Sequence, residues 1–143
     1  MKAKLNESTR VQCAIYEPRI TAIQRIVSEF YGLTLQQTQE HCRKGSSIKA
    51  RRRIHFLCRE FLPKCPLAII GLLTGNGRAF DHATICHAST ALHREMTLKS
   101  RCGKLVYPEV AEEMLVLRLR VASAFLEQKE PVGVCEHCGQ LIN

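Results

Sequence analysis

Apolar residues recur three and four positions apart through most of the chain, which is the period of a helix with one buried face. Pro18 suits the first position of the first such helix, and Gly32 suits its stop. Between them the apolar positions are Ile20, Ile23, Val27 and Phe30. The pattern predicts a helix from Pro18 to about residue 31, preceded by a flexible segment over residues 1–17.

A short helix and a longer one follow. Thr34 with Gln37 three positions later is a capping-box pattern, which predicts a helix to about Cys42, and residues 43–47 are expected to break it. The apolar face of the next helix consists of Ile54, Leu57, Cys58, Phe61 and Leu62, and Pro63 ends it. Its expected first turn carries Lys49, Arg51, Arg52 and Arg53. The helix dipole disfavours cations at a helix start, so a phosphate partner explains this block better than a merely solvated face.

Residues 67–73 form a fourth, very short apolar pattern, which a glycine-containing turn over residues 75–77 closes. Asp81 then suits the N-cap of a fifth helix. Ile85, Ala88 and Leu92 share one side of that helix. The other side presents mainly His82, Ala83, Cys86, His87 and Thr90. A short helix, a turn and a helix with a polar side together match the physical description of a helix-turn-helix DNA reader.

The longest helical pattern covers residues 109–129, after a basic connection that contains helix breakers. One apolar stripe consists of Val110, Met114, Leu117, Val121 and Ala124, and a second consists of Leu115, Leu119, Ala122 and Leu126. So wide an apolar arc needs a partner surface, for which we favour the first and third helices of the same domain over a second copy of the chain. With no β-alternation, the pattern predicts an all-α fold with a five-helix body over residues 18–100. A connection and long C-terminal helix follow over residues 101–130, and a tail over residues 131–143.

Charge is unevenly distributed along the 143 residues. The net charge is +8, but residues 1–108 hold 18 Lys and Arg against 7 Asp and Glu, whereas the remainder is acidic. A basic body favours a polyanion, nucleic acid before anionic membrane, although charge that only aids solubility is the alternative. No run approaches the roughly 20 apolar residues of a membrane span, and no signal segment is visible. Scattered single cysteines are typical of a reducing compartment, so we expect a cytoplasmic, nucleoid-associated protein.

Four sequence stretches point to one family. They are IQRIVSEFYGLTLQQ, RRRIHFL, PLAIIG and DHATICHA, in this order. Over about residues 20–96 they resemble the DNA-binding C-terminal domain, domain IV, of the bacterial replication initiator DnaA. The resemblance implies a helix-turn-helix fold similar to that of Trp repressor and binding to double-stranded DNA. No G-x-x-x-x-G-K-[ST] phosphate loop occurs, so we expect a reader without the initiator's ATPase.

The resemblance also implies residue roles. The residues that would open the recognition helix and touch bases in the major groove are Asp81, His82, Ala83, Thr84 and His87. The basic block of Lys49, Arg51, Arg52 and Arg53 would place an arginine in the minor groove or on phosphate, and the backbone amides of Leu67 and Ala68 would meet phosphate. Arg78, in the turn before the recognition helix, is a further candidate. The chain departs from the family in three features: Ala83 replaces a threonine, this turn is about three residues longer, and the basic block lacks its proline.

Two other interpretations are weighed against DNA binding. One is a helical protein-interaction module of a replication or mobile-element complex, in which DNA contact is incidental. An enzyme is the weakest class: His82 and His87 lie five positions apart without an acidic partner at helical spacing, and His55 sits in the apolar set of its helix, as a core histidine does. We therefore expect a non-catalytic protein acting in replication control, transcription regulation or DNA-processing complexes.

Cys135 and Cys138 form the one C-x-x-C motif, and the glycine after it is typical of a zinc knuckle. A structural zinc ion needs four ligands, and no second C-x-x-C exists. Cys102, His93, His137 or a second chain would have to complete the site. A redox-active pair or an idle pair are the alternatives, so zinc is a candidate cofactor only.

Overall fold

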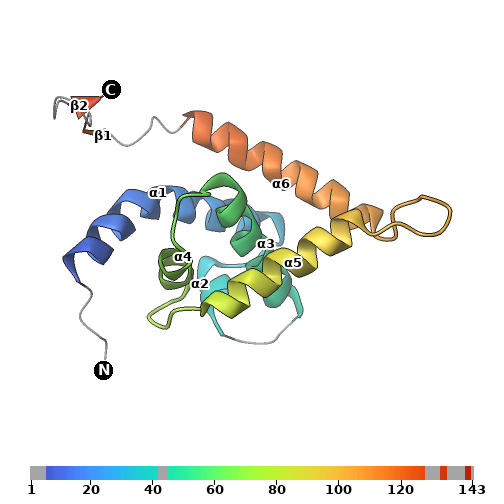
Figure 1. Ribbon diagram of the computed structural model, residues 1–143, viewed down its shortest axis with the longest axis horizontal. Coiled ribbons are helices and arrows are strands. Elements are labelled where there is room, and N and C mark those ends of the chain that lie inside the picture. The colour runs from blue at the N-terminus through green and yellow to red at the C-terminus, as the bar shows by residue number, and fades with distance from the viewer. Residues whose placement is uncertain (1–5, 42–44, 128–132, 135–140, 143) are drawn as a thin grey trace.

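The computed structural model describes residues 6–41, 45–127, 133–134 and 141–142. Their helices are α1 (Glu7–Phe30), α2 (Leu35–Gln39), α3 (Gly45–Phe61), α4 (Leu67–Thr74), α5 (His82–Thr97) and α6 (Pro108–Glu127). Two two-residue strands, β1 (Gly133–Val134) and β2 (Leu141–Ile142), pair antiparallel, with Gly133 opposite Ile142. Helices thus form the whole body (Figure 1), which confirms the predicted all-α class.

The first helix starts earlier than the sequence pattern indicated. Asn6 caps it by accepting a 2.7 Å hydrogen bond from the Thr9 amide, so residues 7–17 are helical and Pro18 lies inside α1. The prediction of a start at Pro18 after a flexible segment is therefore wrong for residues 7–17. The reason is that Pro18 is exposed and a proline removes only one backbone hydrogen bond of an otherwise continuous helix. The predicted stop is confirmed, because Gly32 adopts a left-handed φ of +66° just after the C-cap.

The α2 and α3 boundaries also shift. The capping box is present as predicted, with Thr34 and Gln37 exchanging hydrogen bonds of 2.8 and 3.1 Å. However, α2 ends at Gln39 rather than Cys42, and α3 already begins at Gly45, inside the expected break. The basic block consequently lies in the second and third turns of α3 and not in its first, so the helix-dipole argument for a phosphate partner does not apply.

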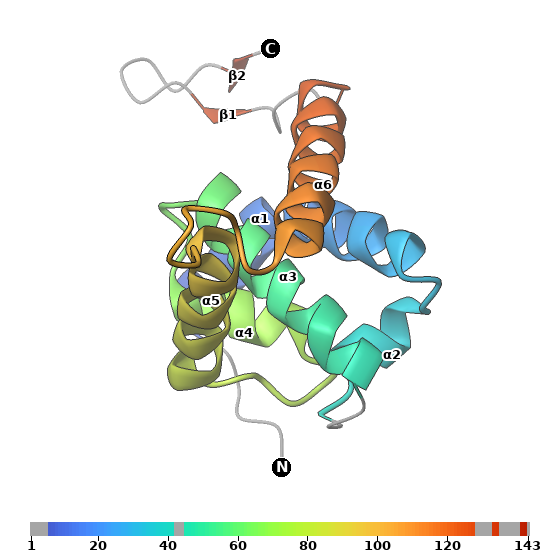
Figure 2. The same ribbon diagram turned by 90° about the vertical axis from the view of Figure 1, so that its right-hand side faces the viewer.

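The core lies where α3 meets its neighbours. Helix α3 contacts α1, α2, α4 and α5, and Figure 2 shows it running through the middle of the body. The residues predicted for its apolar face are buried except Phe61, which is half-buried. The predicted inward side of α5 is buried as well: Ile85, Ala88 and Leu92.

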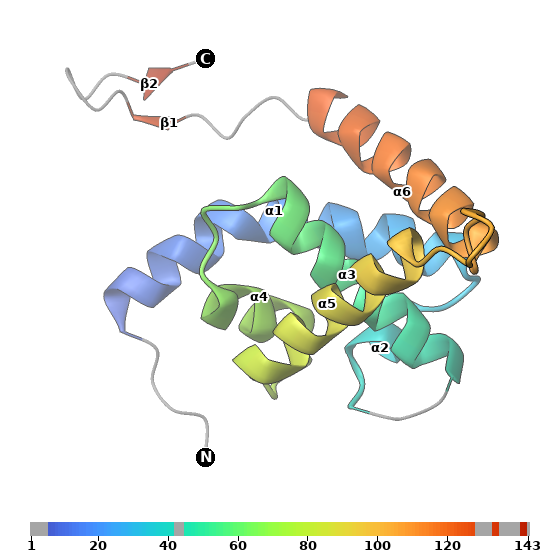
Figure 3. The ribbon, with the colours of Figure 1, turned by 45° about the vertical axis from the view of Figure 1, so that its right-hand side comes forward.

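Helix α6 lies against the body (Figure 3), and one of its two apolar stripes is buried there. Val110, Met114, Leu117 and Val121 are buried, and α6 packs mainly on α1 and α5, which confirms packing within the domain and on the first helix. The third helix, the other predicted partner, meets α6 chiefly through ion pairs, and α5 takes its place in the apolar contact. The second stripe is not covered by the described residues, since Leu115, Leu119 and Leu126 are 57%, 63% and 87% exposed. None of the described helices has the length and apolar character needed to span a bilayer.

Candidate DNA interface

Helices α4 and α5 form the helix-turn-helix pair, and two glycines allow their close approach. A Cβ atom at Gly71 would overlap the carbonyl oxygen of Phe80, and one at Gly75 would overlap that of Arg78. The Phe80 amide donates a 3.1 Å hydrogen bond to the Gly71 carbonyl, which ties the end of the turn to α4. The entry to α5 is therefore held rigidly although its turn is long.

The first turn of α5 is exposed and capped. Asp81 is the N-cap as predicted, and its Oδ1 accepts a 2.7 Å hydrogen bond from the Thr84 amide. That backbone hydrogen bond favours the ionised carboxylate and holds the pKa of Asp81 below its usual value. His82 and Ala83 are exposed beside it. The side chains predicted to meet bases therefore stand at an open helix N-terminus.

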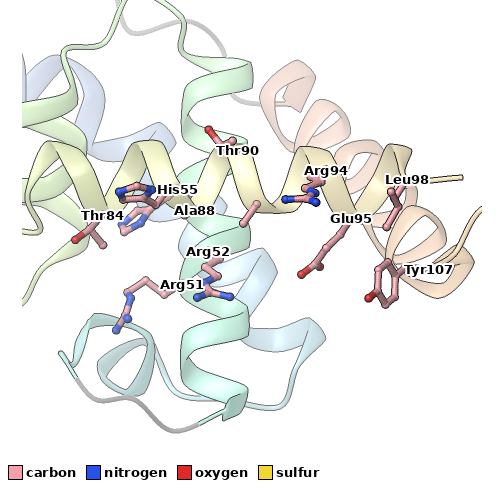
Figure 4. Close-up of a pocket in the computed structure, with 12 residues that line it drawn as sticks. Arg51, Arg52, His55, Thr84, Ala88, Thr90, Arg94, Glu95, Leu98 and Tyr107 are labelled. Carbon is pink, nitrogen blue, oxygen red and sulfur yellow. The ribbon is translucent and has the colours of Figure 1, made fainter.

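A groove of about 680 Å³ runs between α3 and α5 (Figure 4). Its lining consists of Arg51, Arg52, His55, Thr84, His87, Ala88, Thr90, Ala91, Arg94, Glu95, Leu98 and Tyr107. Four predicted site residues thus meet in one place, two from each helix: Arg51, Arg52, Thr84 and His87. Thr84 lies at one end of the groove, and Leu98 and Tyr107 lie at the other.

The Phe80 ring connects this groove to α2 and α3. His41 stacks on it with centroids 4.0 Å apart, and its Nε2 lies 2.7 Å from the Arg78 carbonyl oxygen. The Arg51 guanidinium sits 4.9 Å from the same ring centroid and donates a 2.9 Å hydrogen bond to the Glu40 carbonyl. Arg51 is consequently positioned at the rim by an aromatic face and a carbonyl oxygen.

His55 closes the floor of the groove and is fully buried, as the sequence predicted for a core histidine. Its Nε2 lies 3.0 Å from Thr74 Oγ1, and that hydroxyl donates a 2.7 Å hydrogen bond to the Ile70 carbonyl, so Nε2 carries the proton. Burial first, then the nearby Arg51 and His41, lowers the pKa of His55 to about 3. The imidazole is neutral at physiological pH and contributes no charge toward a polyanion.

Two members of the predicted basic block face away from the groove toward α6. Arg53 is 3% exposed, and its Nη2 lies 3.4 Å from Glu113 Oε2. Lys49 Nζ lies 3.5 Å from Glu113 Oε1, and the Tyr31 hydroxyl donates a 2.9 Å hydrogen bond to Glu113 Oε2. Arg53 thus lies in the α3–α6 contact and Lys49 pairs with the same carboxylate, so neither lines the α3–α5 groove, and their predicted contacts with DNA stay predictions.

The other predicted residues lie around the helix-turn-helix. Pro66 provides no side-chain cap for α4, so the first amides of that helix, at Leu67 and Ala68, remain suited to an anion. Ala68 is exposed and Leu67 is half-buried. Arg78 is exposed in the turn. None of these three lines the α3–α5 groove, so they would have to act from its periphery.

Sequence reasoning missed Arg94, His41, Phe80 and Tyr107 as parts of this site. Arg94 had a signal, because it follows His87 by seven positions and therefore lies on the same side of α5. The contacts of His41 and Phe80 join segments almost 40 residues apart, and no spacing rule indicates them.

The C-x-x-C pair, Cys135 and Cys138, lies outside the described residues, so its zinc site stays a prediction. Within the described part of the chain, no cluster of three or more His, Cys, Asp or Glu is placed to hold a metal ion. The described cysteines include five free thiols, two of them buried. Burial raises the pKa of Cys65 to about 11, as expected for inert structural thiols.

Comparison with known proteins agrees with this architecture. The family model for the bacterial DnaA protein helix-turn-helix matches residues 20–91, from α1 through most of α5. The chromosomal replication initiator protein DnaA of Flavobacterium psychrophilum is 32% identical over 90 residues, which are 63% of this chain but 18% of that protein. The chain thus spans less than a fifth of the relative it matches, and no solved structure matches it. The family match covers half of the chain and confirms the resemblance seen in the sequence: this protein belongs to the bacterial DnaA helix-turn-helix family.

Proposed function

We propose that this protein binds double-stranded DNA with a sequence preference, inserting the first turns of α5 into the major groove. The observation that carries the proposal is the α3–α5 groove, which brings Arg51 and Arg52 beside Thr84 and His87. Base-reading groups and cations on one open face are what a helix-turn-helix reader requires, because base contacts specify a site and phosphate contacts position the protein on it.

In this proposal the residues of the interface have different roles. His82, Ala83, Thr84 and His87 supply imidazole, methyl and hydroxyl groups that distinguish base edges. Arg52 and Arg94 flank them as phosphate contacts, and Arg51 is positioned for the backbone or the minor groove. Asp81 has a structural task as N-cap, and its free oxygen remains available to accept a hydrogen bond from a base. The amides of Leu67 and Ala68 add a helix N-terminus suited to phosphate.

The process is replication control in our proposal, because the matched relative is a replication initiator. Transcription regulation or targeting of a DNA-processing complex would use the same interface. One observation favours the protein-interaction alternative, namely the exposed second stripe of α6. The two functions differ in salt dependence, since only binding to DNA releases condensed counterions.

Binding to a fluorescent 30-bp duplex of mixed sequence tests the proposal. We expect measurable binding at about 50 mM salt and a steep decrease of log K with log salt, because each phosphate neutralised contributes about −0.9 to the slope. Absent or salt-indifferent binding would contradict it.

A second experiment tests the role of the recognition helix. After the preferred site is selected from a random duplex pool, His87→Ala should weaken binding to that site by about 1 to 3 kcal/mol and change binding to mixed-sequence DNA little. His93→Ala is the matched control, because His93 is an exposed histidine of α5 that does not line the groove. Equal effects of the two variants on the selected site would refute the base-reading role of His87.

A further inference from the structure

The connection between α5 and α6, residues 98–107, is a hairpin and not a loose loop. Lys99 and Leu105 form an antiparallel bridge. The Ser100 amide donates a 2.8 Å hydrogen bond to the Lys104 carbonyl, and the Val106 amide donates one of 3.0 Å to the Leu98 carbonyl. Gly103 has a φ of +80°, which closes the turn. We call this segment the 98–107 hairpin.

The hairpin carries an uncompensated positive charge. Lys99, Arg101 and Lys104 are all exposed, and residues 96–108 contain no Asp or Glu. No salt bridge joins any of the three to another residue in the described part of the chain. In contrast, the cations in the contact between α3 and α6 are paired. Lys49 and Arg53 of α3 pair with Glu113, and Arg118 of α6 pairs with Glu60.

The position of the hairpin connects this charge to the α3–α5 groove. Leu98 and Tyr107, the two ends of the hairpin, line the end of the groove opposite Thr84 (Figure 4). Figure 1 shows the hairpin projecting beyond the body at the C-terminal end of α5. The 16 residues of α5 make it about 24 Å long, so the hairpin stands about that distance from the first turn of the recognition helix.

We propose that the 98–107 hairpin is a second DNA-binding element, which contacts the phosphate backbone flanking the base pairs that α5 reads. The proposal rests on the proposed function and extends it, because the hairpin lies outside residues 20–91 that match the family model. Three cations on a projecting hairpin, continuous with the groove, fit a polyanion that runs along that face. A duplex presents one charge per 1.7 Å of axis and supplies such a surface.

Two triple variants with the same loss of charge test the hairpin. The first is Lys99→Gln, Arg101→Gln and Lys104→Gln; the control is Arg10→Gln, Arg25→Gln and Lys64→Gln, three exposed cations that do not line the groove. Binding to the 30-bp mixed-sequence duplex is measured between 50 and 200 mM salt. The hairpin variant should lose at least tenfold in affinity at 50 mM, and its salt slope should be shallower by about 2 to 3. The control should change either quantity much less.

The outcomes separate this proposal from the function it extends. Absence of salt-dependent binding by the wild-type chain overturns both. Wild-type binding with identical slopes for the two triple variants overturns the hairpin alone and leaves the α5 interface standing. Thermal unfolding checks that both variants fold. If the hairpin triple variant does not fold, the single variant Arg101→Gln at the turn replaces it, and its salt slope should be shallower by about 1. Hydroxyl-radical footprints on the selected duplex should lose protection at one edge only, whereas an unchanged footprint contradicts the proposal.

Discussion

The two sides of α3 carry the same kind of side chain but differ in how deeply it is buried and in what it contacts. Toward α6, Arg53 and Lys49 meet the carboxylate of Glu113, and Glu60 near the end of α3 lies 2.9 Å from Arg118 of α6. Toward α5, Arg51 rests on an aromatic ring and a backbone carbonyl, and Arg52 is exposed. The cations toward α6 are paired with carboxylates within the fold, whereas Arg52 on the α5 side is exposed to solvent.

The difference shows that neighbouring arginines in a sequence need not share a role. Successive residues of a helix point about 100° apart, so Arg51, Arg52 and Arg53 sample more than half of the circumference of α3. Glu113 of the acidic C-terminal helix pairs with two cations of α3, Lys49 and Arg53. We infer that α6 stabilises the domain and neutralises the cations on its own side of α3.

Replacing Arg53 should produce the largest loss of stability. Arg53→Ala removes a buried guanidinium from Glu113 and leaves that carboxylate with Lys49 and Tyr31 as its partners. Breaking a buried ion pair by removal of one partner costs roughly 3 to 5 kcal/mol, and the remaining partners favour the lower end. Urea denaturation measures the effect. Arg52→Ala is the control and should stay within about 0.5 kcal/mol of the wild type. Comparable losses of stability from Arg53→Ala and Arg52→Ala would contradict the distinction between the α6 side and the α5 side of α3.

The buried histidine of α3 predicts a loss of stability in mild acid. The folded state holds the pKa of His55 at about 3, far below its ordinary value near 6.5. Between these two pH values His55 is protonated in the unfolded chain but not in the folded chain. The contribution of neutral His55 to the free energy of unfolding is fully present above pH 6.5 and is lost as the pH falls below that value. Between pH 6.5 and 4.5 the free energy of unfolding should decrease by about 2 kcal/mol from this group.

The His55 contribution can be isolated by substitution. His55→Gln keeps a donor for Thr74 and does not titrate, so this variant should show a flatter dependence of stability on pH over the same range. The range lies above pH 4, where the lowered pKa of Asp81 adds little slope. A variant that retains the wild-type slope would show that another group is responsible.

Much of the fold was predictable because it follows from local periodicity. The apolar positions of α3, α4, α5 and the first stripe of α6 locate the core, and the Thr34 and Asp81 caps start their helices as predicted. Boundaries were less predictable, since residues 7–17, none of them fully buried, and glycine at position 45 carry no strong helical signal but are helical. Tertiary packing decides such segments.

The site was predictable in part, and the burial of Arg53 had a readable signal. Arg53 lies three positions after Ala50 and four before Leu57, both fully buried, so it is in phase with the core face of α3. Arg52 is out of phase with that face. The sequence alone does not indicate that the partner of Arg53 is the carboxylate of Glu113, which lies 60 residues later in the chain on α6.

Replacing Arg52 should have the smallest effect on the fold and a selective effect on binding. This side chain is exposed, lines the α3–α5 groove and lies one residue from the buried Arg53. If it neutralises one phosphate, Arg52→Ala should weaken binding to the selected site and to mixed-sequence DNA alike and make the salt slope shallower by about 1. Fluorescence anisotropy on both duplexes measures the two quantities. A loss confined to the selected site would instead assign Arg52 to base recognition, and no loss on either duplex would leave the open side of α3 without a role in DNA binding at this position.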